Sequence, residues 1–308
     1  MRPLRGIIYK LISVVIFIAM SALIKVTAPH IPSGEAVFFR SFFALPIILI
    51  WLYHLKELRQ GLRVTKPWGH VKRGVMGAVA MLFSFAGLGY LPLPEVTAIS
   101  YLAPLLTVVF AAFILKEEVR IFRISAVGLG LVGVFIVVWP KLTFFGVAPQ
   151  AHAGPSETLG VALVLTGATF AALAQIFVRR LVQTDKTPAI VFYFSVTSIA
   201  ISLLTVPFGW IWPTFFEAGL LVLAGLLGGV GQIFLTSSYR EAEASVVAPF
   251  DYASMIFALL IGYFIFAEVP SLTTLAGAAL VIFAGILIIW REDRLGIERA
   301  KQRRAMTP

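Results

Sequence analysis

The chain has 308 residues, 59% of them hydrophobic and only 13% charged, with a mean hydropathy of +0.95. So much apolar surface exceeds what one globular core can bury, which excludes an ordinary soluble protein and indicates a chain that folds in lipid. The absence of cysteine excludes disulfides, thiolate catalysis and cysteine metal sites.

Ten apolar segments are long enough to cross a bilayer, which takes about 20 mostly apolar residues. The first has basic residues before and inside it, like a secretory signal, but it is too long and further spans follow, so we interpret it as a retained helix. We predict an all-α membrane protein with ten transmembrane helices. In chain order the segments are 7–28, 34–54, 74–91, 95–115, 122–140, 158–178, 188–211, 215–238, 244–266 and 271–290.

The basic residues follow this alternation of spans. With the N-terminus in the cytoplasm, only Lys25, Arg40 and Lys141 of the 25 basic residues lie outside the segments on the cytoplasmic side. A one-sided excess across short loops is the positive-inside rule, and it predicts that both termini are cytoplasmic. The net charge of +10 is thus explained by topology and an anionic lipid surface, with no need for nucleic acid. We expect a multi-pass protein of a bacterial inner membrane.

Two parts of the chain resemble each other at an offset of about 150 residues. The stretch EVTAISYLAPLLTVVFAAFILKEEV from Glu95 matches SVVAPFDYASMIFALLIGYFIFAEV from Ser245, which pairs Tyr101 with Asp251. An odd number of helices per repeat makes the second repeat inverted relative to the first. We therefore predict a five-helix repeat at 1–141, a periplasmic linker at 142–157, a second repeat at 158–290 and a basic cytoplasmic tail at 291–308.

Inverted repeats are typical of secondary transporters, whose substrate site lies near mid-membrane where the repeats meet. Duplication also occurs in membrane proteins that transport nothing, so the alternative is a non-transporting scaffold or a lipid-processing subunit. The glycines within the spans favour close helix packing, and the GxxxG from Gly225 to Gly229 indicates an internal contact. Whether the protein is a monomer or a homodimer is left open.

The chain resembles EamA-type members of the drug/metabolite transporter superfamily over nearly its whole length. The resemblance rests on EAVFFR at 35–40, on 90–100, and on the paired span ends KEEV and FAEV, each leading into a Gly-rich helix. It implies a ten-helix secondary carrier of a small metabolite such as an amino acid, a vitamin or a nucleotide-like compound. The FFR sequence with an upstream lysine resembles the branch of S-adenosylmethionine and riboflavin transporters.

Four ionisable residues lie within the predicted spans, where each needs a partner or a purpose: Lys25, Glu35, Arg40 and Asp251. Lys25 and Glu35 lie near the outer ends of their spans and could reach the interface or pair with each other. Arg40 and Asp251 lie closer to the midplane. Arg40 stays charged, so it either binds an anionic group of the substrate or belongs to a fixed ion pair.

Asp251 is the strongest candidate for a coupling residue. It follows Pro249, which removes a helix hydrogen bond and leaves a polar position in the span. A desolvated aspartate can take up and release a proton, as gradient-driven transport requires. The alternatives are a protonated packing residue or a partner of Arg40.

Polar side chains near these positions complete the candidate site. Tyr101 and Tyr252 could position a substrate by stacking, with Ser100 and Ser254 as hydrogen-bonding neighbours, although such residues often only pack. Gln175 and Gln232, near the inner ends of their spans, could line an inner vestibule or join helices.

Motifs of enzymatic chemistry are absent from the sequence. No GxxxxGK[ST], HExxH or GxSxG occurs, and the four histidines lack ligand spacing. We therefore expect no catalytic residue, no metal and no cofactor, and transport driven by gradients or exchange.

Overall fold

The protein is a bundle of helices, seen in a computed structural model that describes residues 3–54, 56–58, 60–115, 121–141, 155–242 and 247–305. Within these residues all regular structure is helical. The first half contains α1 (Pro3–Thr27), α2 (Ser33–Phe42), α3 (Ala44–His54), α4 (Pro67–Leu88), α5 (Leu93–Ser100), α6 (Leu102–Leu115), α7 (Ile121–Val138) and the 3-10 helix η1 (Trp139–Lys141). The second contains α8 (Pro155–Leu181), α9 (Thr187–Leu203), η3 (Val206–Phe208), α10 (Phe215–Glu241), η4 (Ala248–Tyr252), α12 (Ala253–Phe266) and α13 (Leu272–Ala305).

Each of the ten predicted segments contains helix, although the segment 188–211 is α-helical only to Leu203 and has no helix after Phe208. Seven are long and apolar enough to cross a membrane, and the apolar helices at Thr187–Leu203, Phe250–Phe266 and Leu272–Leu287 are shorter. The chain is thus an all-helical, multi-pass membrane protein. The count of ten crossings and the sidedness of the termini stay predictions.

Several boundaries differ from the predicted ones. α4 begins at Pro67, not at residue 74, so Arg73 lies inside a helix and is buried. α13 continues to Ala305, so helix extends through most of the predicted tail. Most of the predicted linker, residues 142–154, lies outside the described residues.

Two of the predicted spans are broken into two helices each, and proline explains both breaks. α2 ends at Phe42 and α5 ends at Ser100. Each end lies four residues before a proline, Pro46 or Pro104. A proline has no N–H to donate to the carbonyl four residues earlier, and its ring crowds that carbonyl, so the helix is interrupted there. In the span that contains Pro249, the 3-10 helix η4 directly precedes α12.

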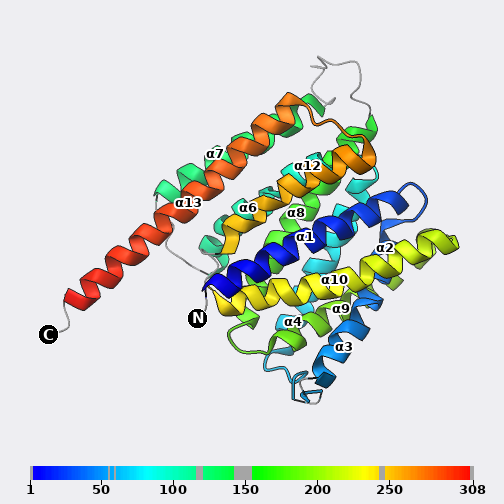
Figure 1. Cartoon of the computed structure of the whole chain (residues 1–308), viewed down its shortest axis with the longest axis horizontal. Helices are drawn as coiled ribbons and strands as arrows, with labels where there is room; N and C mark the ends of the chain where they lie inside the picture. Colours follow the sequence, from blue (N-terminus) through cyan, green and yellow to red (C-terminus); the bar gives the residue numbers. More distant parts are fainter. Residues whose placement is uncertain are drawn as a thin grey trace.

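Helices distant in sequence pack side by side in a pattern that relates the two halves. α1 lies along α10, α4 along α8, and α7 along α13 (Figure 1). In the order of the repeats, α1 corresponds to α8 and α4 corresponds to α10, so the α1–α10 contact is equivalent to the α4–α8 contact. The α2–α9 and α7–α13 contacts each join two corresponding helices. A two-fold relation between the halves would produce this pattern.

Glycines allow the closest of these contacts. A side chain at Gly225 would meet Phe43, and one at Gly229 would meet Ala44, so the GxxxG faces the α2–α3 junction inside the bundle, as predicted. Gly133 of α7 and Gly277 of α13 face each other in the same way, each approaching the carbonyl of the other.

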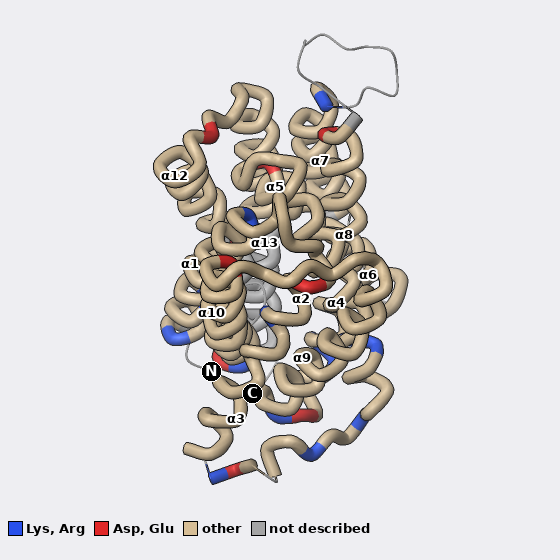
Figure 2. Tube along the Cα trace, turned by 90° about the vertical axis from the view of Figure 1, so that its right-hand side faces the viewer, with Lys and Arg blue, Asp and Glu red and all other residues tan. Residues whose placement is uncertain are grey.

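Charge distinguishes the two ends of the bundle. We call the end where α1 begins and α13 finishes the basic end; Figure 2 shows Lys and Arg gathered there. The end where α1 finishes is called the acidic end. Its acidic residues include Glu35, Glu95, Glu157, Glu217 and Glu268.

Candidate functional site

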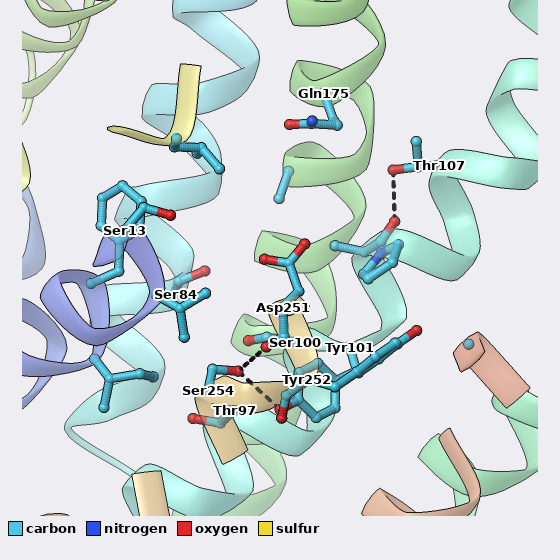
Figure 3. Close-up of a pocket in the computed structure, with 18 of the residues that line it drawn as sticks. Ser13, Ser84, Thr97, Ser100, Tyr101, Thr107, Gln175, Asp251, Tyr252 and Ser254 are labelled. Carbon is cyan, nitrogen blue, oxygen red and sulfur yellow. Dashed lines mark hydrogen bonds between the residues drawn. The ribbon is translucent and has the colours of Figure 1, made fainter. Parts of the chain in front are cut away.

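A cavity of about 660 Å³ lies among α1, α4, α5, α6, α8, α10, η4, α12 and α13, inside the bundle. Its wall includes hydroxyl groups as well as apolar side chains, and Figure 3 shows polar side chains from several helices around the same region. Of the predicted site residues, it brings together Asp251, Tyr101, Tyr252, Ser100, Ser254 and Gln175. A cavity of this size suits a small organic molecule.

An ion pair lies at the wall of this cavity. The Lys10 Nζ is 2.7 Å from the Asp251 Oδ1, and it also donates to the Tyr239 hydroxyl at 3.3 Å. The Lys10 side chain is only 2% exposed, whereas that of Asp251 is 35% exposed. The carboxylate therefore keeps free acceptor positions toward the cavity, and Figure 3 shows it directed away from the two tyrosines, toward the region of Gln175.

The partner of Asp251 is not Arg40, which the sequence analysis gave as an alternative. Arg40 does not meet Asp251; Lys10 does. The charge pattern alone groups Lys10 with the basic residues that set topology, although it lies within the predicted span 7–28. The rule that an ionisable residue inside a span needs a partner or a purpose would have selected it.

Tyr101 and Tyr252 form the aromatic part of the site. Their ring centroids are 5.1 Å apart at an interplanar angle of 72°, an edge-to-face contact. The Tyr101 hydroxyl donates to the Tyr252 carbonyl at 3.2 Å and shares a 2.9 Å hydrogen bond with the Ser254 hydroxyl. Ser254 in turn donates to the Asp251 carbonyl at 2.6 Å. This chain of bonds connects the junction of α5 and α6 to the start of α12.

The broken helices position these groups. Tyr101 is the residue between α5 and α6, and Asp251 and Tyr252 lie in η4. Matching positions of the two predicted repeats thus meet at helix interruptions beside the cavity. Gly285 of α13 leaves room for the Tyr252 ring, which a side chain there would displace.

Gln175 and Arg179 line the cavity on the side of the basic end. Both lie on the last two turns of α8, which finishes at Leu181. The Ser100 hydroxyl also lines the cavity but donates to the Val96 carbonyl at 2.7 Å, so its lone pairs remain for a ligand.

Ion pairs join the helices at the acidic end of the cavity. The Lys25 Nζ lies 2.9 Å from the Glu268 Oε1 and donates to the carbonyls of Leu91 at 2.7 Å and Leu88 at 3.3 Å. The other Glu268 oxygen accepts from the Leu93 N–H at 2.8 Å. Lys25 and Glu268 therefore join α1, the α4–α5 connection and the α12–α13 connection at this end.

A second ion-pair group stands beside the first. Lys141 lies 2.8 Å from Glu95 and 3.0 Å from Glu157. It connects the end of α7 with α5 and the start of α8.

Four predicted site residues, Lys25, Glu35, Arg40 and Gln232, are not among the described residues that line the cavity. Glu35 is buried and accepts from the Ile211 N–H at 3.1 Å, so it fastens the start of α2 to the connection before α10. Lys25 pairs with Glu268 rather than with Glu35, because the α12–α13 connection brings that carboxylate within reach. Gln232 and Arg40 are buried on α10 and α2, and neither is among the described residues that line the cavity.

Comparison with known proteins identifies the class of this chain. The model of the EamA-like transporter family matches it twice, at residues 4–139 and 158–291. An S-adenosylmethionine uptake transporter of Rickettsia felis is 28% identical over 292 residues, covering 94% of both chains. A pseudopaline exporter of Pseudomonas aeruginosa is 28% identical over 291 residues, covering 92% of this chain and 95% of the relative.

Two further comparisons extend these matches. A Helicobacter pylori protein described as an uncharacterized transporter is 30% identical over 296 residues, covering 92% of this chain and 94% of the relative. A solved crystal structure 20% identical in sequence superposes with a TM-score of 0.66, covering 94% of this chain and 98% of that one. This likeness concerns the fold.

The matched stretches span most of the sequence, so the chain belongs to the EamA-like transporter family. Its function class is membrane transport of small metabolites, and the non-transporting alternative is not favoured. The family resemblance predicted from the sequence is confirmed.

Proposed function

We propose that this protein is a secondary transporter of a small amphoteric metabolite, one that carries both a cationic and an anionic group, and that it works by alternating access. The observation that carries the proposal is the Lys10–Asp251 pair at the wall of the cavity. An ammonium and a carboxylate side by side offer complementary partners to a zwitterion, such as the amino-acid part of a metabolite. A zwitterionic substrate bound there would pair its cationic group with Asp251 and its anionic group with Lys10.

The aromatic residues support binding of a planar or cationic portion of the same molecule. Tyr101 and Tyr252 present ring surface beside Asp251, and a cation gains from both a carboxylate and a π-face. S-adenosylmethionine, which is named for one group of relatives, has this combination: an amino acid, a sulfonium and an aromatic base. It is therefore the first compound to test on this chain.

The unequal closure of the two ends supports alternating access. Lys25 and Glu268 hold helices together at the acidic end, while the cavity wall includes Gln175 and Arg179 near the basic end. We propose that this arrangement is an inward-facing state, with both termini in the cytoplasm of a bacterial cell and ten crossings in two inverted repeats. The double family match and the exchanged helix contacts are what support the repeats.

Asp251 is proposed to couple transport to a gradient or to exchange. While Lys10 holds it, the pair is neutral overall. A substrate ammonium or a proton that binds the Asp251 carboxylate breaks this pair and releases Lys10 to bind a substrate carboxylate. We propose that breaking the pair favours closure of the basic end.

The test is transport by purified protein in liposomes. Labelled S-adenosylmethionine, amino acids, nucleosides and riboflavin are supplied on either side, with and without a pH gradient. We expect saturable flux of at least one amphoteric compound and none of the uncharged nucleosides. Folded protein that moves no member of the panel would support the non-transporting alternative, and flux of riboflavin alone would contradict the role of the ion pair.

A further inference from the structure

Two arginines are buried together on the side of the bundle away from the cavity. Arg40 of α2 is 2% exposed and Arg73 of α4 is 6% exposed. Their guanidinium carbons lie 5.2 Å and 4.0 Å from the ring centroid of Phe194 on α9. Two permanent positive charges therefore share one small volume among α2, α4, α9 and α10.

The hydrogen-bonding capacity of these arginines is largely unused. The Nε and Nη1 atoms of both have no acceptor among the described residues. Arg40 Nη2 donates to the Gly228 carbonyl over a long 3.4 Å. Within the described part of the chain, no acidic side chain forms an ion pair with either residue. Contact with one aromatic face does not supply the counter-charge that a buried guanidinium needs.

The position of the pair is related to the symmetry of the halves. Residues 35–41, EAVFFRS, align with 189–195, AIVFYFS, which places Arg40 opposite Phe194 in the second half. Likewise GVMG from Gly74 aligns with GLLG from Gly225, so that Gly77 corresponds to Gly228. Gly228 makes room for Arg40, and Gly77 makes room for Arg73 and Phe194. The arginines thus lie where corresponding segments of the halves meet.

An additional donor lies within the same helix layer. Ser198 of α9 is fully buried, and its hydroxyl has no partner among the described residues. It lies one helical turn beyond Phe194, on the same face. Arginine cannot lose its proton in a protein, and its fork of N–H donors fits oxyanions and halides. Buried, positively charged hydrogen-bond donors that lack an acceptor favour binding of an anion.

We propose that Arg40 and Arg73 form a binding site for one small anion, buried among α2, α4, α9 and α10 and separate from the substrate cavity. The shared chemistry is that of a small monovalent anion: a free inorganic ion such as chloride, or a carboxylate. Bound there, the anion joins the first half, which supplies the arginines, to α9 of the second half. The site does not depend on the Lys10–Asp251 pair.

The experiment measures the thermal unfolding of the purified protein while small anions replace gluconate, a carboxylate too bulky for a site that holds one small anion, at constant ionic strength. Chloride, nitrate and acetate are titrated one at a time. A saturable rise of several degrees in the unfolding midpoint is expected, because a ligand that binds only the folded state stabilises it. Saturation by chloride or nitrate identifies a free inorganic ion, whereas saturation by acetate alone identifies a carboxylate.

Matched variants locate the effect. Arg73→Gln and Arg40→Gln should lose the saturable response, while Arg179→Gln, at the substrate cavity, should keep it. In gluconate, Arg73→Gln should be at least as stable as the wild type, because it removes an uncompensated buried charge; in chloride the order should reverse.

Two results would overturn the proposal. One is a wild-type midpoint that does not respond to any of the anions; this measurement holds even if the variants fail to fold. The other is an equal response in the wild type and in both arginine variants. Neither result bears on flux through the cavity, and a loss of flux in the liposome assay does not bear on this midpoint.

Discussion

The acidic and basic ends of the cavity each contain a Lys–carboxylate pair, but the two pairs differ in how fully protein groups satisfy them. At the acidic end, Lys25 is shared among a carboxylate and two backbone carbonyls, and these bonds close the bundle. Toward the basic end, the Asp251 carboxylate holds a single described cation, Lys10, and keeps more than a third of its side chain exposed. One pair is saturated by the protein, and the other retains capacity for a ligand. The difference separates a closing contact from a binding contact, although both are Lys–carboxylate pairs.

The largest expected effect is that of Asp251→Asn. The amide keeps the size of the side chain but cannot carry the charge that Lys10 and a substrate cation share. Gradient-driven flux in liposomes should fall at least about tenfold, corresponding to the loss of one charge-assisted contact, with protein levels near normal. Glu57→Gln, in a connection at the basic end, serves as the control and should transport normally. If instead Asp251→Asn lowers only expression, its role is structural.

The contact that closes the acidic end should matter less. Lys25→Ala or Glu268→Ala removes the ion pair but leaves the cavity intact, so the substrate should still bind while its flux falls about fivefold, a cost of roughly 1 kcal/mol in the closed state. The reversed pair, Lys25→Glu with Glu268→Lys, should recover part of the flux. Flux and binding that fall together in the single variants would instead place Lys25 in the binding site.

A smaller effect is expected for Tyr101→Phe. This variant keeps the ring against Tyr252 but loses the hydroxyl that bonds Ser254 and the Tyr252 carbonyl. One hydrogen bond contributes about 0.5 to 1 kcal/mol, so the substrate concentration at half-maximal flux should rise about threefold. Tyr101→Ala, which also removes the ring, should be markedly worse. Equal values for the two variants would mean that the ring contributes nothing.

The smallest effect concerns a contact outside the membrane-spanning segments, at the basic end. Burial raises the pKa of Asp185, but hydrogen bonds from Thr65 and His70 outweigh it and hold the pKa below its usual value of 3.8. The folded state therefore favours ionised Asp185, a stabilisation that is present above that usual value and lost as the pH falls through the lowered pKa.

Thermal unfolding checks this at pH 7 and pH 3. Asp185→Asn should lower the midpoint by about 2 °C at pH 7, and this difference should become smaller at pH 3, below the usual pKa of the carboxyl. The control is Glu241→Gln on the last turn of α10, because the Glu241 carboxylate forms no ion pair among the described residues. An unchanged difference at the two pH values would show that the ionisation of Asp185 does not stabilise the fold.

The sequence predicts the apolar helices well because lipid imposes a long apolar run on a helix that crosses it. The internal repeat, which pairs Tyr101 with Asp251, predicts less directly that both residues lie where the two halves meet. The sequence does not identify Lys10 and Arg73 as buried residues, because basic residues near the ends of spans fit the positive-inside rule; in the structure both are buried. The helix breaks were readable from Pro46 and Pro104, four residues beyond each break. The partners of Lys25 and Lys10 depend on how distant helices pack, which one sequence does not contain.

The natural absence of cysteine permits a direct test of alternating access. A single Ser100→Cys variant places a thiol at the cavity wall, and exposed controls are Gln60→Cys near the basic end and Phe208→Cys near the acidic end. A membrane-impermeant maleimide is added to either side of liposomes with oriented protein, at rest and during transport. Ser100→Cys should react from the side of Gln60 at rest and from both sides during transport. Labelling from one side only, while flux continues, would contradict the account.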